Sequence, residues 1–138
     1  MAEPEPHVLV VAHRTAATPL LLAEVRRRAR AGPCRITLLV PRPYWDPDTE
    51  EAELVVELAI PLLEDAAGKR VDPVIGESDP VEAVRQLLAT THVDEVIVST
   101  LPQRVSHWLR RDVPSRLEAL GPPVTVVTAA HSSRSLIT

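Results

Sequence analysis

The sequence predicts a single doubly wound α/β domain, in which helices cover both faces of a parallel sheet. Short continuous runs of apolar, mostly β-branched residues recur along the chain, as in strands buried on both faces. Segments with apolar residues at helical spacing separate these runs, and such alternation gives parallel strands joined by right-handed crossovers. The length of 138 residues suits one domain, for which we expect residues 7–130, with flexible ends at 1–6 and 131–138.

Five segments are predicted as strands. Asp72 and Pro73 place the weakest of them at an edge of the sheet, because proline donates no hydrogen bond to a neighbouring strand. The five segments are His7–Ala12, Arg35–Val40, Arg70–Ile75, Glu95–Thr100 and Val124–Ala129.

The first two helices are predicted from their end signals. Thr18 before Pro19 indicates an N-cap and a first helical position, and Gly32 ends that helix. The second helix opens near Asp46 or Asp48, closes at Gly68 and contains Pro61, which predicts a kink. Its inward stripe is predicted to consist of Leu54, Val55, Leu58, Ala59 and Leu62.

The last two helical regions also begin with recognisable signals. Asp79 as N-cap, Pro80 at the first position and Glu82 at the third form a capping box, and Val81, Val84, Leu87 and Leu88 are predicted to face inward. In 105–120 we expect a short turn with Trp108 and Leu109, then a helix from near Asp112 that ends at Gly121.

Composition excludes several classes of function. A net charge of −4 with 2% aromatic residues argues against nucleic-acid binding, and no apolar run is long enough to span a membrane. One cysteine and five dispersed histidines favour neither a disulfide nor a metal site. Four scattered glycines exclude a P-loop and a G-x-G-x-x-G turn. The acidic start lacks the features of a signal peptide, so we expect a cytoplasmic protein.

Three segments together resemble the universal stress protein family: HVLVVA, DEVIVST and WLRRDVPSRLEALGPPVTVVTA. The resemblance covers roughly the whole chain as a pattern of elements. It implies a Rossmann-like or flavodoxin-like fold with strand order 3-2-1-4-5, dimerisation through the last strand and, in one subclass of the family, ATP binding.

The ATP-binding subclass carries the motif G-x2-G-x9-G-[ST], and this chain departs from it throughout. Ser99, Pro102 and Asp112 stand at the glycine positions, and Val113 stands at the Ser/Thr position. Proline has no N–H for a phosphate, and we expect the Asp112 carboxylate to cap the following helix and so occupy the anion site. Tight triphosphate binding is therefore expected to be lost, with no cofactor; ATP or AMP binding is the alternative.

The topological switch point between the first and fourth strands is the predicted ligand site, because open α/β sheets bind ligands there. Polar strand ends also occur without any ligand. We call this region, at the carboxyl ends of the first and fourth strands, the mouth of the sheet. The residues expected there are Ala12, His13, Arg14, Val40, Ser99, Thr100, Pro102, Arg104, Trp108, Arg110, Arg111 and Asp112.

Three interpretations compete at this mouth. Trp108 could stack on a base, although packing is the favoured role for a lone tryptophan. Arg14, Arg104, Arg110 and Arg111 could hold phosphates in place of glycine amides. Ser99, His13 and Asp112 are residue types of a hydrolase triad, but without a G-x-S-x-G elbow we expect no enzyme.

The last predicted strand is an apolar edge without Lys or Pro, which invites pairing with a second copy. Val124, Val126 and Thr128 are the expected dimer contacts. The sequence therefore favours a non-catalytic homodimer that acts in stress response or regulation through a small ligand or a protein partner.

Overall fold

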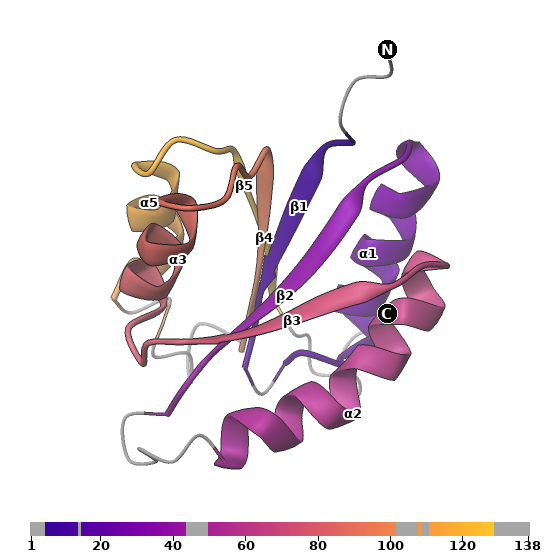
Figure 1. Cartoon of the computed structure of the whole chain (residues 1–138), viewed down its shortest axis with the longest axis horizontal. Coiled ribbons are helices and arrows are strands. Elements are labelled where there is room, and N and C mark those ends of the chain that lie inside the picture. The colour runs from indigo at the N-terminus through magenta and orange to yellow at the C-terminus, as the bar shows by residue number, and fades with distance from the viewer. Residues whose placement is uncertain (1–4, 14, 44–49, 102–107, 109–110, 129–138) are drawn as a thin grey trace, which may run out of the picture.

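The computed structural model describes residues 5–13, 15–43, 50–101, 108 and 111–128. Strands and helices alternate along the chain (Figure 1), as the sequence predicts. The strands are β1 His7–Val11, β2 Arg35–Pro41, β3 Val71–Gly76, β4 Glu95–Thr100 and β5 Val124–Thr128. The helices are α1 Pro19–Ala31, α2 Glu50–Ala67, α3 Pro80–Leu88 and α5 Val113–Glu118.

All five strands form one parallel sheet in the order β3-β2-β1-β4-β5, which confirms the predicted fold class and strand order. β1 lies at the centre, where Val10 is in register with Leu38 of β2 and Ile97 of β4. Every residue of β1 is buried, as expected for a central strand covered on both faces.

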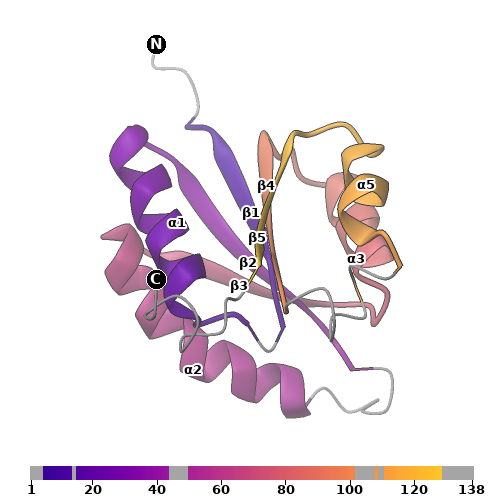
Figure 2. The ribbon, with the colours of Figure 1, turned by 180° about the vertical axis from the view of Figure 1, so that it is seen from behind.

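In the described part of the chain, two helices cover each face of the sheet. α1 and α2 lie on one side, and α3 and α5 lie on the other (Figure 2). Alternate residues of β1 enter the two cores: Val8 and Val10 pack under α1 and α2, whereas Leu9 and Val11 pack under α3 and α5. Aliphatic side chains therefore build both cores, as the scarcity of aromatic residues requires.

The predicted starts of α1 and α3 are confirmed with one difference in chemistry, whereas Asp46 and Asp48, where α2 was predicted to open, lie outside the described residues. Asp79 caps α3 as expected, because its Oδ1 accepts a 2.9 Å hydrogen bond from the Val81 N–H. Thr18 occupies the N-cap of α1, but its hydroxyl donates to the Thr15 carbonyl at 3.1 Å instead of capping the helix. Pro19 still begins α1, so proline at the first position marks this helix start without a side-chain cap.

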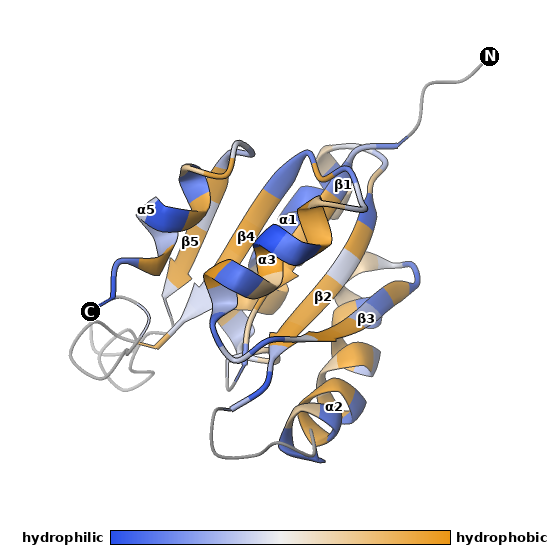
Figure 3. Cartoon of the chain, turned by 60° about the vertical axis from the view of Figure 1, so that its left-hand side comes forward, coloured by the Kyte–Doolittle hydropathy of each residue, from blue (hydrophilic) through white to orange (hydrophobic). Residues whose placement is uncertain are grey.

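The inward stripe predicted for α2 is wrong for its leucines. Leu54, Leu58 and Leu62 are 57%, 72% and 47% exposed. The buried side consists of Ala52, Ala59, Leu63, Ala66 and Ala67. Apolar residues lie on more than one side of this helix (Figure 3), and the side rich in alanine packs against the sheet because small side chains allow close approach. α2 continues through Pro61.

The two edge strands differ in how their outer backbone groups are satisfied. The Gly76 carbonyl accepts from the Arg42 N–H, so by alternation Val71, Pro73 and Ile75 direct their backbone groups away from β2. Val71 N–H donates to Glu64 Oε2 of α2 at 3.0 Å, and Pro73 has no N–H. Thus β3 is an edge strand, as Asp72 and Pro73 predict, and two of its three outward positions have no N–H available for another strand.

No helix in the described part of the chain is long and apolar enough to cross a membrane.

Candidate functional site

The carboxyl ends of β1 and β4 meet at the centre of the sheet, where the predicted switch point lies. Ala12 directly follows β1, and Ser99 and Thr100 end β4; all three are buried. Val40 in β2 is also buried, and the Ala12 N–H donates to the Leu39 carbonyl at 3.2 Å. These four predicted residues are thus the buried part of the mouth.

A buried pair of hydroxyls joins the two sides of the mouth. Ser99 Oγ lies 2.7 Å from Thr15 Oγ1 and 3.4 Å from the Thr15 carbonyl oxygen. Ser99 is 1% exposed and Thr15 is 2% exposed. The same Thr15 carbonyl accepts from the backbone and hydroxyl of Thr18, so the turn after β1 is fixed before α1 begins. The Ser99 side chain fills space that a glycine would leave open.

His13 extends the mouth toward α2. Its Nε2 lies 4.0 Å from Glu51 Oε1, and the two side chains are 15% and 34% exposed. Glu51 belongs to the acidic first turn of α2, so this pair joins the turn after β1 to a helix that follows a different strand. A protonated His13 would form an ion pair with this carboxylate.

Thr100 marks the other side of the mouth. Its Oγ1 lies 3.4 Å from Thr128 Oγ1, at the ends of the paired strands β4 and β5. Thr100 is buried, whereas Thr128 is exposed at the end of the edge strand. This contact places the predicted ligand region beside the predicted dimer edge.

Asp112 does not cap α5 as the sequence analysis expects. It occupies the N-cap position with left-handed backbone, φ 56° and ψ 41°, and its side chain makes no capping hydrogen bond. An N-cap residue with extended backbone aims its side chain at the first helical amides, and the left-handed conformation abolishes that geometry. Asp112 is exposed, and Val113 after it is buried in the core.

Two other predicted mouth residues have different environments. Trp108 is half-buried and packs against the core under α3 and α5, in agreement with the packing interpretation. Arg111 is exposed. The remaining predictions at the mouth, Arg14, Pro102, Arg104 and Arg110, lie outside the described residues.

The geometry does not assemble the three residue types of a hydrolase triad. Ser99 is bonded to Thr15, His13 is paired with Glu51, and Asp112 lies exposed before α5. Over the described ranges, no three His, Cys, Asp or Glu side chains gather in a group that could hold a metal ion. Among the predicted residues that the structure describes, the partly exposed His13 imidazole and the exposed Arg111 guanidinium are therefore the basic groups open to a ligand, and both can donate hydrogen bonds to an anion.

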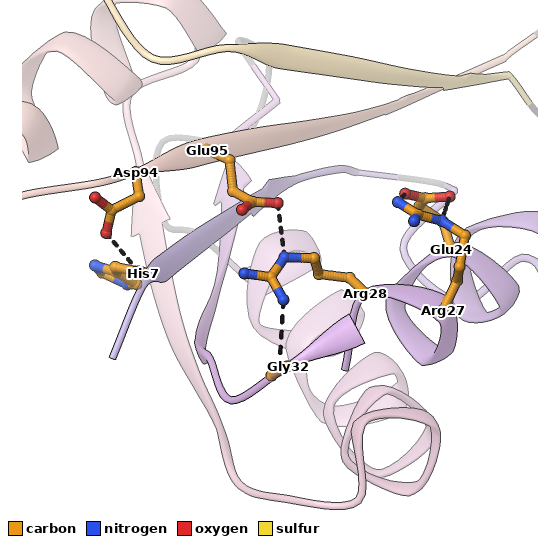
Figure 4. A network of polar contacts seen from close by, with 7 residues as sticks. All are labelled: His7, Glu24, Arg27, Arg28, Gly32, Asp94 and Glu95. Atoms are coloured by element: carbon orange, nitrogen blue, oxygen red, sulfur yellow. Dashed lines mark hydrogen bonds and ion pairs between the residues drawn. The ribbon is translucent and has the colours of Figure 1, made fainter. Parts of the chain in front are cut away.

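The amino end of the sheet carries a separate polar network, of which Figure 4 shows the bond between His7 and Asp94. His7 Nδ1 donates to the His92 carbonyl at 2.9 Å, which leaves Nε2 to accept from the Thr37 hydroxyl at 2.7 Å in the neutral ring. Asp94 accepts the His7 N–H at 2.8 Å and a second bond from His92. These bonds, the backbone bond first, lower the pKa of Asp94.

Sequence reasoning missed the partners of the mouth residues. Neither Thr15 as the partner of Ser99 nor Glu51 as the partner of His13 was predicted from the sequence. Both partners come from distant segments, so spacing along the chain carries no signal for either contact. The one available clue is a small hydroxyl residue after each of two central strands.

Comparison with known proteins places the chain by fold. No family model and no curated protein matches the sequence. A universal stress protein solved in complex with cAMP superposes with a TM-score of 0.62 at 18% identity, over 92% of this chain and 100% of the other.

Two structures of universal stress proteins from Archaeoglobus fulgidus superpose in the same way. One has a TM-score of 0.57 at 14% identity, over 90% of this chain and 93% of the other. The second, in complex with dAMP, has a TM-score of 0.61 at 13% identity, over 92% and 98%. The chain therefore has the fold of universal stress proteins, as the sequence resemblance implies.

Proposed function

We propose that this chain is a non-catalytic universal stress protein, a cytoplasmic homodimer that acts in stress response or regulation without tight ATP binding. The central support is the buried Ser99 side chain, which lies where the resemblance places the first glycine of the ATP motif and is bonded to Thr15. A phosphate loop needs open backbone at that position, and a filled, hydrogen-bonded side chain removes it.

The backbone at Asp112 supports membership of the family. The resemblance places the third glycine of the motif at this residue, and Asp112 has the left-handed φ of 56° that glycine adopts without strain. Among the described residues that are not glycine, it alone has a positive φ. At this one position the chain thus has the backbone conformation that the glycine of the motif favours, although its side chain differs from the motif.

Binding of an adenine nucleotide is the second candidate, and the cAMP and dAMP complexes of similarly folded proteins favour it. In this case arginine side chains replace the glycine amides, since guanidinium groups bind phosphate through paired hydrogen bonds. Arg111, exposed before α5, is a described candidate for that role.

Thermal unfolding separates the two candidates. The protein is heated alone and with millimolar Mg-ATP, AMP, cAMP or inorganic phosphate. We expect no shift in Tm with ATP, whereas a nucleotide at about 100 times its Kd would add about 2.7 kcal/mol, or several degrees. A clear ATP shift that disappears in Arg110→Ala/Arg111→Ala would establish the arginine-based alternative.

A restored motif tests the role of Ser99 directly. The variant Ser99→Gly/Pro102→Gly/Asp112→Gly returns glycine to the three motif positions, and we expect it to gain an ATP-dependent rise in Tm that the parent protein lacks. Circular dichroism checks that the variant folds. A folded variant without any ATP response would show that the motif positions do not account for the loss.

The free edge of β5 supports a homodimer. The Pro123 carbonyl accepts from the Val96 N–H, so by alternation Val124, Val126 and Thr128 direct their backbone groups away from β4. Val126 is also 41% exposed. Unprotected edges of this kind pair readily with a second strand, and a two-fold axis would cover both edges.

Sedimentation equilibrium tests this interface. We expect the parent protein to be a dimer and Val126→Lys to be a monomer, because a lysine on an edge strand opposes strand pairing. Leu58→Lys on α2, at the other edge of the sheet, is the matched control and should remain dimeric. A dimer that persists in Val126→Lys contradicts assembly through β5.

A further inference from the structure

α2 exposes a continuous row of leucines to solvent. Leu54, Leu58 and Leu62 are 57%, 72% and 47% exposed. They recur every four residues, so they lie on one side of the helix on successive turns. Pro61, also exposed, lies beside them. Exposed leucines are common singly, but an aligned row is typical of a surface that contacts a partner.

Acidic side chains border this leucine row. Glu50 precedes Leu54 by four residues, Glu57 follows it by three, and Asp65 follows Leu62 by three, which places each acid next to the row. All three are exposed. Throughout Glu50–Ala67 every charged residue is acidic, so α2 combines an apolar row with a uniformly negative border.

We propose that this face of α2 docks a cationic amphipathic helix from a partner protein. Such a helix has aliphatic side chains at intervals of three or four residues, which would pack between the leucines of α2 as ridges into grooves. Its Lys or Arg side chains would lie against Glu50, Glu57 and Asp65. The apolar contacts supply the binding free energy, and the charges supply specificity and a fast association rate.

The same charges argue against two other occupants. A second copy docked α2 against α2 would bring two acidic borders together, and like charges across an interface oppose binding. An anionic bilayer would also be repelled, because helices that lie on such membranes carry basic residues on their polar face. A cationic helix is the occupant whose charge matches this surface.

Peptide binding tests the proposal. A fluorescein-labelled peptide of about five helical turns, with leucines every three or four residues and lysines elsewhere, is titrated with the full chain while anisotropy is measured. Two comparison peptides replace all lysines by glutamates or all leucines by serines. We expect binding of the Lys/Leu peptide alone, with weaker affinity at higher salt.

Variants of α2 locate the site. Leu58→Gln should weaken the Lys/Leu peptide at least tenfold, and Glu57→Lys/Asp65→Lys should weaken it and accelerate dissociation. Val126→Gln changes an exposed apolar residue on β5, at the opposite edge of the sheet, and should bind as the parent does. Unchanged Tm in Leu58→Gln checks that the exposed substitution leaves the fold intact.

Three results would overturn the proposal. If the peptide with serines in place of leucines binds equally well, the contact is only a general attraction of positive charge. If Leu58→Gln binds the Lys/Leu peptide as the parent does, the peptide binds elsewhere. Self-association that is lost in Leu58→Gln but retained in Val126→Lys would identify a second copy as the occupant. Each readout is independent of nucleotide binding and of pairing through β5, so the proposal stands or falls separately from the proposed function.

Discussion

The two ends of the sheet use polar side chains in different ways. At the amino end, His7 of β1, Thr37 of β2 and Asp94 before β4 are bonded to one another or to the backbone. At the carboxyl end, Ser99 and Thr15 form a comparable buried pair, while His13 after β1 and Arg111 and Asp112 before α5 are at least partly exposed. Each end therefore has a buried polar core, but the exposed groups of the amino end, His92 and Asp94, are bonded to each other.

This difference separates a structural network from a candidate ligand site. A buried polar group that is fully hydrogen-bonded stabilises the fold and offers little to a ligand. The carboxyl end is where ligands bind in open α/β sheets, and Arg111 and Asp112, which precede α5, are exposed. Substitutions at the amino end should therefore change stability, whereas those at the carboxyl end should change binding more than stability.

His7→Ala should have the largest effect on stability. It removes two ring hydrogen bonds from a residue that is 5% exposed, and it leaves the Thr37 hydroxyl without its ring partner. We expect a loss of about 3 kcal/mol in the free energy of unfolding, measured in urea. His92→Ala, whose side chain is 84% exposed, is the control and should lose less than about 1 kcal/mol. Equal losses would contradict a buried network centred on His7.

A double-mutant cycle measures the pair at the carboxyl end. Ser99→Ala and Thr15→Val should each lower the free energy of unfolding by about 1 kcal/mol, because each removes the same 2.7 Å contact. Together they should lose less than the sum, with a coupling of about 1 kcal/mol. Additive losses would show that the two hydroxyls do not depend on each other. Thr15→Ser, which keeps the hydroxyl, should retain most of the coupling.

Asp112→Gly distinguishes backbone strain from helix capping. The left-handed conformation costs a residue with a side chain about 1 kcal/mol, and glycine avoids that cost but has a more flexible unfolded chain. The free energy of unfolding should therefore remain equal or rise by less than about 1 kcal/mol. If Asp112 were a helix cap, the free energy of unfolding would instead fall by a few tenths of a kcal/mol. Asp79→Gly at the true cap of α3 is the comparison and should lose a few tenths of a kcal/mol.

Acid titration should reveal a small contribution from Asp94. Hydrogen bonds from the His7 backbone and from His92 lower the pKa of Asp94 in the folded protein. Its stabilising contribution is therefore complete above the ordinary carboxyl pKa and is lost as the pH falls through the lowered folded value. Asp94→Asn should reduce stability at neutral pH and flatten the dependence of stability on pH below the ordinary carboxyl pKa. Parallel curves for parent and variant would contradict this coupling.

Local signals predicted the elements of the fold well. Buried apolar runs identified the strands because both faces of a central parallel strand are covered, and Asp79 with Pro80 located the start of α3. The inward face of α2 was predicted less well. Its sequence has apolar residues on several sides, so periodicity alone could not decide that Ala59 faces the sheet and Leu58 faces solvent.

The candidate site was predicted as a location but not as a set of contacts. The switch-point rule placed Ser99 and His13 at the mouth, since it depends only on strand order. Their partners Thr15 and Glu51 depend on how distant segments meet in space, which no spacing rule encodes. Asp112 was misjudged because residue type suggested a cap, while capping depends on backbone dihedral angles that the sequence does not reveal.

The protected edge of β3 limits the size of any assembly built by strand pairing. Of its three outward positions, Pro73 offers no donor and the Val71 donor is already bonded to Glu64. Strand pairing at β3 is therefore disfavoured relative to pairing at β5, where each outward residue has an N–H. Two copies joined through β5 would present only the disfavoured β3 edges, whereas a sheet with two favourable edges could propagate into a filament.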